Sequence, residues 1–175
     1  MQDIYSRARK IRLAVFDVDG VLTDGALYYA DSGEESKRFN VHDGHGMRML
    51  KESGVMIAII TSRSSRCVAE RARNLGIELL FQGAEDKLTA FRELLGRCGV
   101  EEAACAYVGD DIVDLPVMAR CGLSVTVAGA PALVRRRAHF VTRARGGEGA
   151  AREACELILY AQGSRAATLP AGSEK

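Results

Sequence analysis

Two aspartates separated by one residue, Asp17 and Asp19, come directly after an apolar run in the string DVDGVLTD. In an extended chain such residues project to the same side, so their carboxylates repel each other unless a cation or a shared proton intervenes. Gly20 follows them and permits a sharp turn or the close approach of a ligand. A strand end followed by an Asx-type turn is the alternative interpretation. The string indicates a site where clustered carboxylates need a cation.

A second acidic cluster, GDDIVD, occupies residues 109–114 and also follows an apolar run. If Asp110 lies beside Asp17, the two complete a set of hard oxygen ligands. Carboxylates, a backbone carbonyl and water molecules are the ligands that suit Mg²⁺. Asp111 or Asp114 could instead cap a helix that starts near Leu115–Pro116. We therefore expect Asp110 to bind the metal and Asp114 to support it or to be structural.

Two further residues fit the same chemistry. Thr61 ends an apolar run, and Ser62 and Arg63 are expected to open the next helix, whose free amides would cradle a phosphate with the threonine hydroxyl. Lys87 begins a helical pattern, where a lysine is poorly placed with respect to the helix dipole. Alone it would be interpreted as a surface lysine. Together with the acidic residues, it is predicted to neutralise a phosphorylated aspartate.

The elements that must position these residues alternate along the chain. Four solidly apolar runs predict buried strands, namely Ile11–Phe16, Val55–Ile60, Ala104–Val108 and Leu123–Val127. Helical patterns lie at Gly46–Ser53, Ser64–Leu75, Lys87–Cys98 and Pro116–Ala119. This alternation predicts an α/β fold with a doubly wound, Rossmann-like parallel sheet and helices on both faces. Ligands of such sheets bind beyond the carboxyl ends of the strands, where Asp17 falls.

One insertion interrupts this alternation. Residues 24–39 contain aromatic, turn-forming and then alternating polar residues, which predict a small β-hairpin. No other stretch is long enough for a large cap domain, so we expect one domain over residues 1–175. The hairpin would display Leu27, Tyr28 and Tyr29. Residues 163–175 are small and polar and are predicted to form a disordered tail.

Composition restricts the partners of the chain. With 24 basic and 23 acidic residues, the formal charge is +1, which offers no bulk attraction to nucleic acid or to an anionic membrane. The five cysteines form no CxxC pair, and small buried thiols in a reducing compartment are expected. The longest apolar run, Val55–Ile60, is too short to span a bilayer, and Met1–Lys10 is polar. We expect a cytoplasmic protein.

From Ile11 to Gln162, the order of aspartate pair, hydroxyl residue, lysine and acidic cluster resembles the haloacid dehalogenase superfamily of phosphohydrolases. The resemblance implies that Asp17 attacks phosphorus and that Asp19 protonates the leaving alcohol and then activates water. It further implies that Asp17, the carbonyl of Asp19 and Asp110 hold Mg²⁺. Thr61 and Lys87 would bind the phosphoryl oxygens.

Five strings resemble a narrower group, the phosphatases that release Kdo from 3-deoxy-D-manno-octulosonate 8-phosphate for lipopolysaccharide: DVDGVLTDG, FNVHDGHG, QGAEDK, GDDIVDLP and RGGEGAAREACEL. Arginine suits such a substrate, because a guanidinium matches the sugar carboxylate. The implied substrate contacts are Asn40, His42, Asp43, Gly44, Arg48, Thr61, Ser62, Arg63, Arg71 and Lys87. The group often has arginine at position 42 and glycine at position 62, so these departures bear on affinity.

The resemblance also implies an assembly. In this group the short hairpin builds a homotetramer whose neighbouring subunits close each active site, and the C-terminal segment covers a neighbour's site. Gly146–Gly149 would then give flexibility to that segment and bring Arg152 near the substrate. Since no strand precedes these glycines, they are not expected to form a phosphate-binding loop of their own.

Other interpretations remain open at this stage. A signalling receiver domain also combines acidic residues, a hydroxyl residue and a lysine, but Asp19 would supply an acid/base group that a receiver does not need. A dehalogenase would not need the magnesium ligands, whereas a phosphatase of a related nine-carbon keto acid phosphate and a regulatory phosphatase-like subunit remain open. His42 and His45 could bind a transition metal, but no cysteine or glutamate has the matching spacing. Arg135–Arg137 fit a solvated helix face.

Overall fold

The structure is a computed structural model that describes residues 2–164 of the 175-residue chain. The tail predicted at about 163–175 lies outside the described residues, apart from Gly163 and Ser164. None of the helices in the described part has the length and apolar character that crossing a membrane requires.

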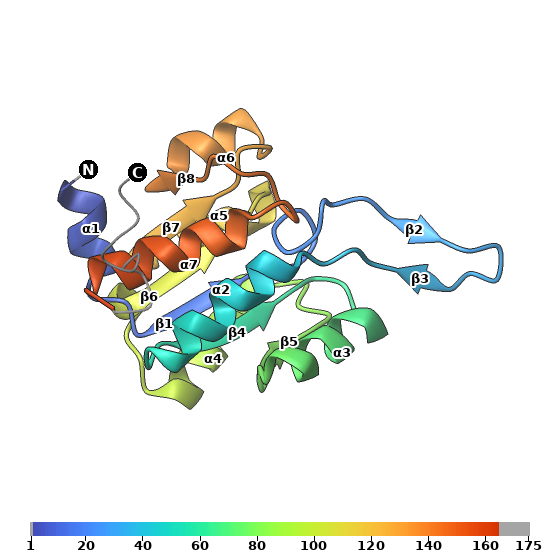
Figure 1. Ribbon diagram of the computed structural model, residues 1–175, viewed down its shortest axis with the longest axis horizontal. Helices are drawn as coiled ribbons and strands as arrows, with labels where there is room; N and C mark the ends of the chain where they lie inside the picture. The colour runs from blue at the N-terminus through green and yellow to red at the C-terminus, as the bar shows by residue number, and fades with distance from the viewer. Residues whose placement is uncertain (1, 165–175) are drawn as a thin grey trace, which may run out of the picture.

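Six parallel strands form a single sheet in the order β5-β4-β1-β6-β7-β8 (Figure 1). Their bounds are β1 Leu13–Phe16, β4 Met56–Ile60, β5 Leu79–Phe81, β6 Cys105–Val108, β7 Leu123–Thr126 and β8 Phe140–Val141. The four predicted strands are β1, β4, β6 and β7, which are almost entirely buried. The predicted doubly wound parallel sheet is confirmed.

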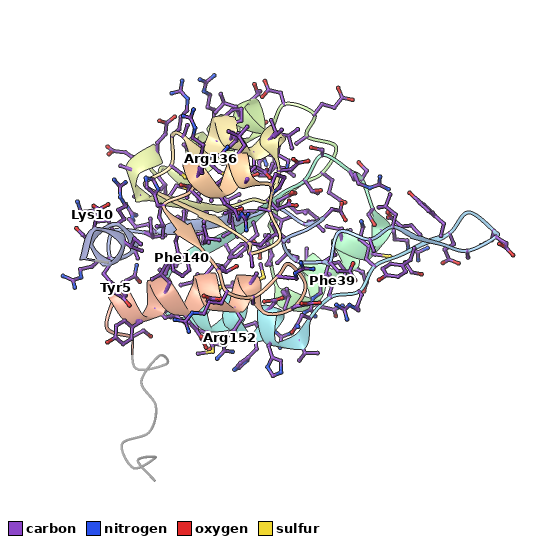
Figure 2. The ribbon with its side chains drawn as sticks, turned by 90° about the horizontal axis from the view of Figure 1, so that it is seen from above. Tyr5, Lys10, Phe39, Arg136, Phe140 and Arg152 are labelled. Atoms are coloured by element: carbon purple, nitrogen blue, oxygen red, sulfur yellow. The ribbon has the colours of Figure 1, made fainter. Side chains whose placement is uncertain are left out.

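Helices cover both faces of the sheet, and Figure 2 shows the two layers from above. On one face, α2 (Val41–Glu52) packs along α7 (Ala150–Ala161), with α1 (Gln2–Ala8) and α3 (Arg66–Leu75) beside them. The other face carries α4 (Lys87–Cys98), α5 (Leu115–Met118) and α6 (Ala132–Arg137). Two short 3₁₀ turns, Glu102–Ala104 and Ile112–Asp114, precede β6 and α5.

Helix α4 shows why the local sequence specifies its element. It begins where Asp86 accepts hydrogen bonds from the amides of Leu88 and Thr89, and it ends at Gly99, which has a φ of 60°. Its buried apolar residues recur at helical spacing and face the sheet, as predicted: Phe91, Leu94 and Leu95. The predicted bounds of this helix agree with the structure.

Helix α7 was not predicted, and it corrects the interpretation of the C-terminal segment. Seven of its residues are buried in the core: Ala150, Ala151, Ala154, Cys155, Ile158, Leu159 and Ala161. It approaches α2 so closely that a Cβ atom on Gly46 would lie 2.7 Å from Cδ of Arg152. This part of the segment therefore packs within its own chain, and the cover of a neighbouring active site implied for the C-terminal segment stays a prediction.

The predicted hairpin is confirmed as a small antiparallel pair, β2 (Tyr28–Tyr29) and β3 (Glu35–Ser36). It projects from the carboxyl edge of the sheet (Figure 1), and Arg63 and Cys67 contact its strands through hydrogen bonds to Tyr29 and Glu35. Leu27, Tyr28 and Tyr29 are 51%, 44% and 57% exposed. No larger cap is present among residues 2–164, so the sheet edge is open on this side.

Candidate active site

The carboxyl ends of β1 and β6 meet at the point where the strand order reverses. Phe16 pairs with Val108, and the amide of Asp17 donates to the Val108 carbonyl at 2.9 Å. Asp110 therefore lies beside Asp17, as predicted. Carboxylate oxygens of Asp17, Asp110 and Asp114 lie within 4.8 Å of one another, and we call these three residues the Asp17 cluster.

The cluster concentrates negative charge in a buried place. Burial, and then the charge of Asp114, raise the pKa of Asp17 to about 6. Burial, and then the charge of Asp17, raise the pKa of Asp110 to about 7. No described side chain donates a hydrogen bond to the Asp110 carboxylate. Hard carboxylate oxygens that repel one another and retain free lone pairs fit a Mg²⁺ ion.

Lys87 is the cation of the cluster. It is the first residue of α4, its side chain is 2% exposed, and its Nζ lies 3.0 Å from Oδ2 of Asp17 and 2.6 Å from Oδ1 of Asp114. Burial alone would lower the pKa of Lys87, but the charges of Asp17 and Asp114 raise it above its usual value. The lysine therefore stays charged beside the expected position of a phosphoryl group.

Asp114 accepts hydrogen bonds from several residues around the Asp17 cluster. Its Oδ1 accepts from Lys87 and, at 2.7 Å, from the hydroxyl of Tyr107. Its Oδ2 accepts from the amides of Asp110 and Asp111 at 3.0 and 3.1 Å. Since both oxygens are occupied, Asp114 has the geometry of a residue that orients Lys87 and the 109–114 loop. Tyr107 gave no signal in the sequence, because it resembles any other residue of a buried strand.

Glycines let a second loop press against the Asp17 loop (residues 17–24). Gly20 has a φ of +86°, and a Cβ atom there would lie 2.1 Å from Oδ2 of Asp110. A Cβ atom on Gly146 would lie 1.8 Å from the carbonyl oxygen of Gly20. The amide of Gly147 donates to the carbonyl of Val21 at 3.0 Å. These glycines serve close packing, and the flexibility expected of Gly146–Gly149 is wrong.

Asp19 does not join the Asp17 cluster. The chain turns at Val18, whose carbonyl accepts from the amides of Val21, Leu22 and Thr23, so the extended geometry expected for residues 17–19 does not form. The Oδ1 of Asp19 instead lies 2.5 Å from Nζ of Lys37. Sequence reasoning missed Lys37, because its spacing within the polar hairpin gives no sign of this contact.

Thr61 follows β4 next to the Asp17 loop, since Ile59 of β4 pairs with Phe16. It is buried, but the helix expected to open at Ser62 and Arg63 begins only at Arg66. The loop between them is tied to the following loop, because the Ser65 amide donates to Oε1 of Gln82 at 2.8 Å. The expected cradle of helix amides at Thr61 is therefore wrong. Ser62 and Arg63 are exposed in this loop.

Two expected substrate contacts fasten the start of α2. Asn40 caps this helix by accepting from the amides of His42 and Asp43, and its Nδ2 donates to the Gly147 carbonyl at 3.3 Å. The buried Asp43 carboxylate accepts from the amides of Gly149 and Arg152 at 3.3 and 2.8 Å. Burial raises the pKa of Asp43. Both residues have a structural contact in this chain.

The expected arginine contacts lie apart from the Asp17 cluster. Arg71 donates to the Asn40 carbonyl at 3.0 Å and lies 5.7 Å from the ring centroid of Phe39, at the base of the hairpin (Figure 2). Gly44 leaves room for it, because a Cβ atom there would lie 2.2 Å from Nη2 of Arg71. Arg48 donates to the Asn74 carbonyl at 2.5 Å. No ion pair joins Arg48 or Arg71 to the cluster within residues 2–164.

The other proposed metal site gains no support. His42 and His45 are exposed on α2, and the only three-residue ligand group found among the described residues is the Asp17 cluster. Arg135–Arg137 form an exposed face of α6, as predicted.

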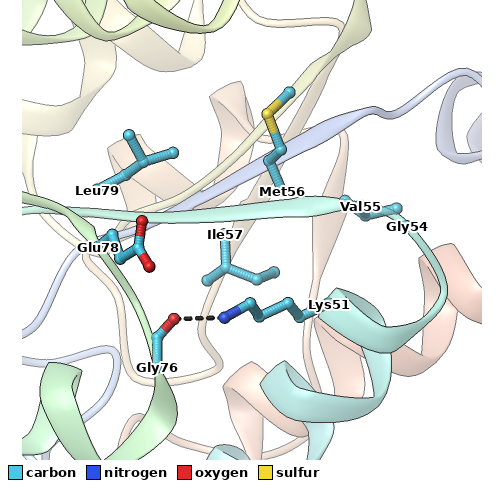
Figure 3. A pocket seen from close by; sticks show the side chains of 8 residues that line it. All are labelled: Lys51, Gly54, Val55, Met56, Ile57, Gly76, Glu78 and Leu79. Carbon is cyan, nitrogen blue, oxygen red and sulfur yellow. Dashed lines mark hydrogen bonds between the residues drawn. The ribbon is translucent and has the colours of Figure 1, made fainter.

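A cavity of about 320 Å³ lies at the opposite edge of the sheet (Figure 3). It is lined by Lys51, Gly54, Val55, Met56, Ile57, Gly76, Glu78 and Leu79. These residues surround the amino ends of β4 and β5, whereas Asp17 follows the carboxyl end of the parallel strand β1. The ammonium group of Lys51 donates to the Gly76 carbonyl, as the dashed line shows. The candidate site is therefore the Asp17 edge and not this cavity.

Comparisons with known proteins agree with this geometry. Residues 43–122 match the family model of the haloacid dehalogenase-like hydrolases. The chain is 51% identical to the 3-deoxy-D-manno-octulosonate 8-phosphate phosphatase of Yersinia pestis, over 91% of this chain and 86% of the relative. Its identity to the phosphatase of the same name from Escherichia coli K12 is 50%, over 92% and 86%.

A solved structure adds ligands to the comparison. The phosphatase of that name from Moraxella catarrhalis, in complex with magnesium ion, phosphate ion and a KDO molecule, superposes with a TM-score of 0.91. Its sequence identity is 45%, and the match covers 93% of this chain and 94% of that chain. The chain therefore belongs to the haloacid dehalogenase-like hydrolases and, among them, to the family of the 3-deoxy-D-manno-octulosonate 8-phosphate phosphatases.

Proposed function

We propose that this chain hydrolyses 3-deoxy-D-manno-octulosonate 8-phosphate to Kdo and phosphate, a step of lipopolysaccharide biosynthesis. The observation that carries the proposal is the Asp17 cluster with Lys87 at the open carboxyl edge of the sheet. Identity near 50% over nine-tenths of the chain to phosphatases of this substrate supports the choice of sugar.

The reaction runs in two displacements. An oxygen of Asp17 attacks phosphorus, the bond to the C8 oxygen breaks, and that oxygen takes a proton from Asp19. Asp19, now a carboxylate, takes a proton from water, whose oxygen attacks the phosphorus of phospho-Asp17 and releases phosphate. Lys87 stays beside Asp17 and offsets the charge of the phosphoryl oxygens. Bound Mg²⁺, held by Asp17, Asp110 and the Asp19 carbonyl, would supply charge neutralisation.

Substrate recognition needs cations at the mouth of the site. Arg63 is half exposed, lies 3.8 Å from Asp19 and is the arginine of this chain best placed to pair with a sugar carboxylate. Thr61 is buried at the end of β4, next to the Asp17 loop, and would donate to a phosphoryl oxygen. His42, Arg48, Ser62 and Arg71 complete the proposed set, with Asn40, Asp43 and Gly44 shaping the surface that carries them.

We also propose that the chain acts as a homotetramer with shared active sites. Within the described residues, the edge that carries Asp17 has no cap of its own, and an exposed aspartyl phosphate would be open to bulk water. The hairpin displays three large apolar side chains that a second subunit would cover: Leu27, Tyr28 and Tyr29. In that assembly, Arg48 and Arg71 would face the site of a neighbouring subunit.

Light scattering tests the assembly. Leu27→Asp should yield smaller species, because it places a charge in the proposed interface. Leu133→Asp changes an apolar residue of α6 that is 40% exposed, and it should leave the tetramer intact. A monomeric, fully active wild-type protein at assay concentration would exclude the shared site.

We also propose that the chain forms a single domain and that it is a cytoplasmic protein. All six parallel strands belong to one sheet, which supports a single domain. Every cysteine is free, which supports a reducing compartment, the cytoplasm.

A substrate panel tests the function. Phosphate release is measured with Mg²⁺ for the Kdo 8-phosphate, for a nine-carbon keto acid 9-phosphate and for p-nitrophenyl phosphate. We expect kcat/KM to be highest for the eight-carbon substrate and activity to vanish in EDTA. A preference for the nine-carbon substrate would move the assignment to a related keto-sugar phosphatase. Stable phosphorylation of Asp17 without turnover would indicate a receiver-like role.

A further inference from the structure

The side chain of Lys37 is buried, although lysine side chains are usually exposed. It follows β3 at the root of the hairpin, between the exposed residues Ser36 and Arg38, yet its side chain is only 1% exposed. A buried ammonium group is stable only when anions surround it. Lys37 has two such partners, Asp19 Oδ1 at 2.5 Å and Glu35 Oε1 at 3.4 Å.

These contacts belong to a small network of alternating charges. Arg63 donates to Glu35 Oε1 at 3.0 Å and to the Tyr29 hydroxyl at 2.7 Å. The two oxygens of Asp19 have different surroundings. Oδ1 receives the short contact from Lys37, whereas Oδ2 has, among residues 2–164, only the guanidinium of the half-exposed Arg63 at 3.8 Å. The hairpin lysine therefore holds one oxygen of Asp19 by a short contact, whereas the other oxygen has only a longer contact with Arg63.

We propose that Lys37 is a positioning residue that holds Asp19 by its Oδ1 and so directs proton transfer to its Oδ2. This inference rests on the proposed function, in which Asp19 is the acid and base. A cation at Oδ1 excludes a proton from that oxygen, so the proton given to the leaving alcohol comes from Oδ2. When the phosphorus–oxygen bond breaks, the leaving oxygen gains that proton and Asp19 becomes a carboxylate, still held by Lys37.

The test uses phenyl phosphate and p-nitrophenyl phosphate, whose leaving groups differ in how strongly they require protonation by an acid. Phenolate is a more basic leaving group than p-nitrophenolate, so phenyl phosphate depends more strongly on protonation, while the two rings are similar in size. The measured quantity is kcat/KM with Mg²⁺, which covers the steps through phosphoryl transfer to Asp17 and omits the attack of water. We expect Lys37→Met to lower kcat/KM about a hundredfold for phenyl phosphate and less than about tenfold for p-nitrophenyl phosphate.

Three variants separate positioning from simple support of the hairpin. Lys37→Arg keeps a cationic donor and should recover most of the loss. Arg38→Met removes a neighbouring cation of the hairpin root, which lies 3.4 Å from Asp24, and should change neither ester. In an Asp19→Asn background, Lys37→Met should cost little more, because its effect acts through Asp19.

The outcomes are distinct. Equal losses on both esters, or full additivity with Asp19→Asn, would show that Lys37 only supports the hairpin and would overturn the proposal. Should Lys37→Met unfold, Lys37→Gln gives the same comparison with a neutral donor, and a larger loss on phenyl phosphate is again expected. Failure of the wild type to release phosphate from the Kdo 8-phosphate in the same buffer would count against the proposed function itself.

Discussion

The contact between Gly146 and the Asp17 loop gives the sharpest prediction. A Cβ atom at residue 146 would lie 1.8 Å from the Gly20 carbonyl oxygen and 2.9 Å from that of Thr23. Both neighbours are backbone atoms, so no rotamer change relieves the overlap. To reach 3.0 Å, the shortest separation that real Cβ atoms show, the two loops must move apart by at least 1.2 Å in Gly146→Ala. Gly20 is also the residue that touches Asp110, so the shift reaches the metal ligands.

A displacement of this size has a defined cost. Misplacing a reacting group by about 1 Å lowers turnover by about a hundredfold, and overpacking lowers the free energy of unfolding by about 1–3 kcal/mol. Steady-state kinetics and urea unfolding measure the two effects. Gly96→Ala is the control, because nothing lies within 4 Å of its Cβ position on the exposed side of α4. It should keep kcat and gain about 0.5–1 kcal/mol of stability. If Gly146→Ala keeps kcat within twofold, the loop yields freely and the packing argument is wrong.

Three further predictions concern the buried charges. Asp17→Asn should fold but lose turnover, because an amide cannot attack phosphorus, and residual activity within about tenfold of the wild type would exclude the mechanism. Burial raises the pKa of Asp17 to about 6 and that of Asp110 to about 7. The two protonated carboxyl groups therefore stabilise the metal-free protein fully below about pH 4, and this stabilisation is lost as the pH rises through 6 and 7. The Tm in EDTA should therefore fall from pH 5 to pH 8, less steeply in Asp110→Asn, and Mg²⁺ should reverse the fall; a flat profile would contradict this. Asp114→Ala removes the buried acceptor of Lys87 and of the Tyr107 hydroxyl. It should lower the free energy of unfolding, measured in urea, by about 3–5 kcal/mol. A loss below about 1 kcal/mol would show that Lys87 and Tyr107 find other partners easily.

The sheet could be predicted where burial is complete. The four residues of β1 are all buried, so their apolar run has no other simple explanation. The edge strand β5 has three half-buried residues, and β8 has one half-buried and one exposed residue, which are patterns too short to separate from a loop. Helix α7 could have been found, since Ala150, Ala154, Cys155 and Ile158 follow helical spacing. The glycines before it directed attention to flexibility instead.

The site was predictable where residues close in sequence carry its chemistry. Asp17 and Asp110 each follow a buried strand, and parallel strands bring such positions together. The partners of Lys37 and Asp43 depend on contacts of a different range, since the Asp43 carboxylate accepts from the amide of Gly149, 106 residues later, at the start of α7. Nothing in the composition of FNVHDG distinguishes a carboxylate that caps a distant helix from one that faces a ligand.

The packing of α7 has a consequence for the order in which the protein is made. The Asp17 loop is synthesised well before Gly146 and Gly147, which lead into α7 and press on this loop. A nascent chain still attached to the ribosome at residue 145 carries Asp17 without this support, and helix α2 lacks its main neighbour. Phosphatase activity should therefore appear only once α7 has emerged, so chains that still lack α7 would not consume phosphate esters. A protease that removes this helix should silence the enzyme without touching a catalytic residue.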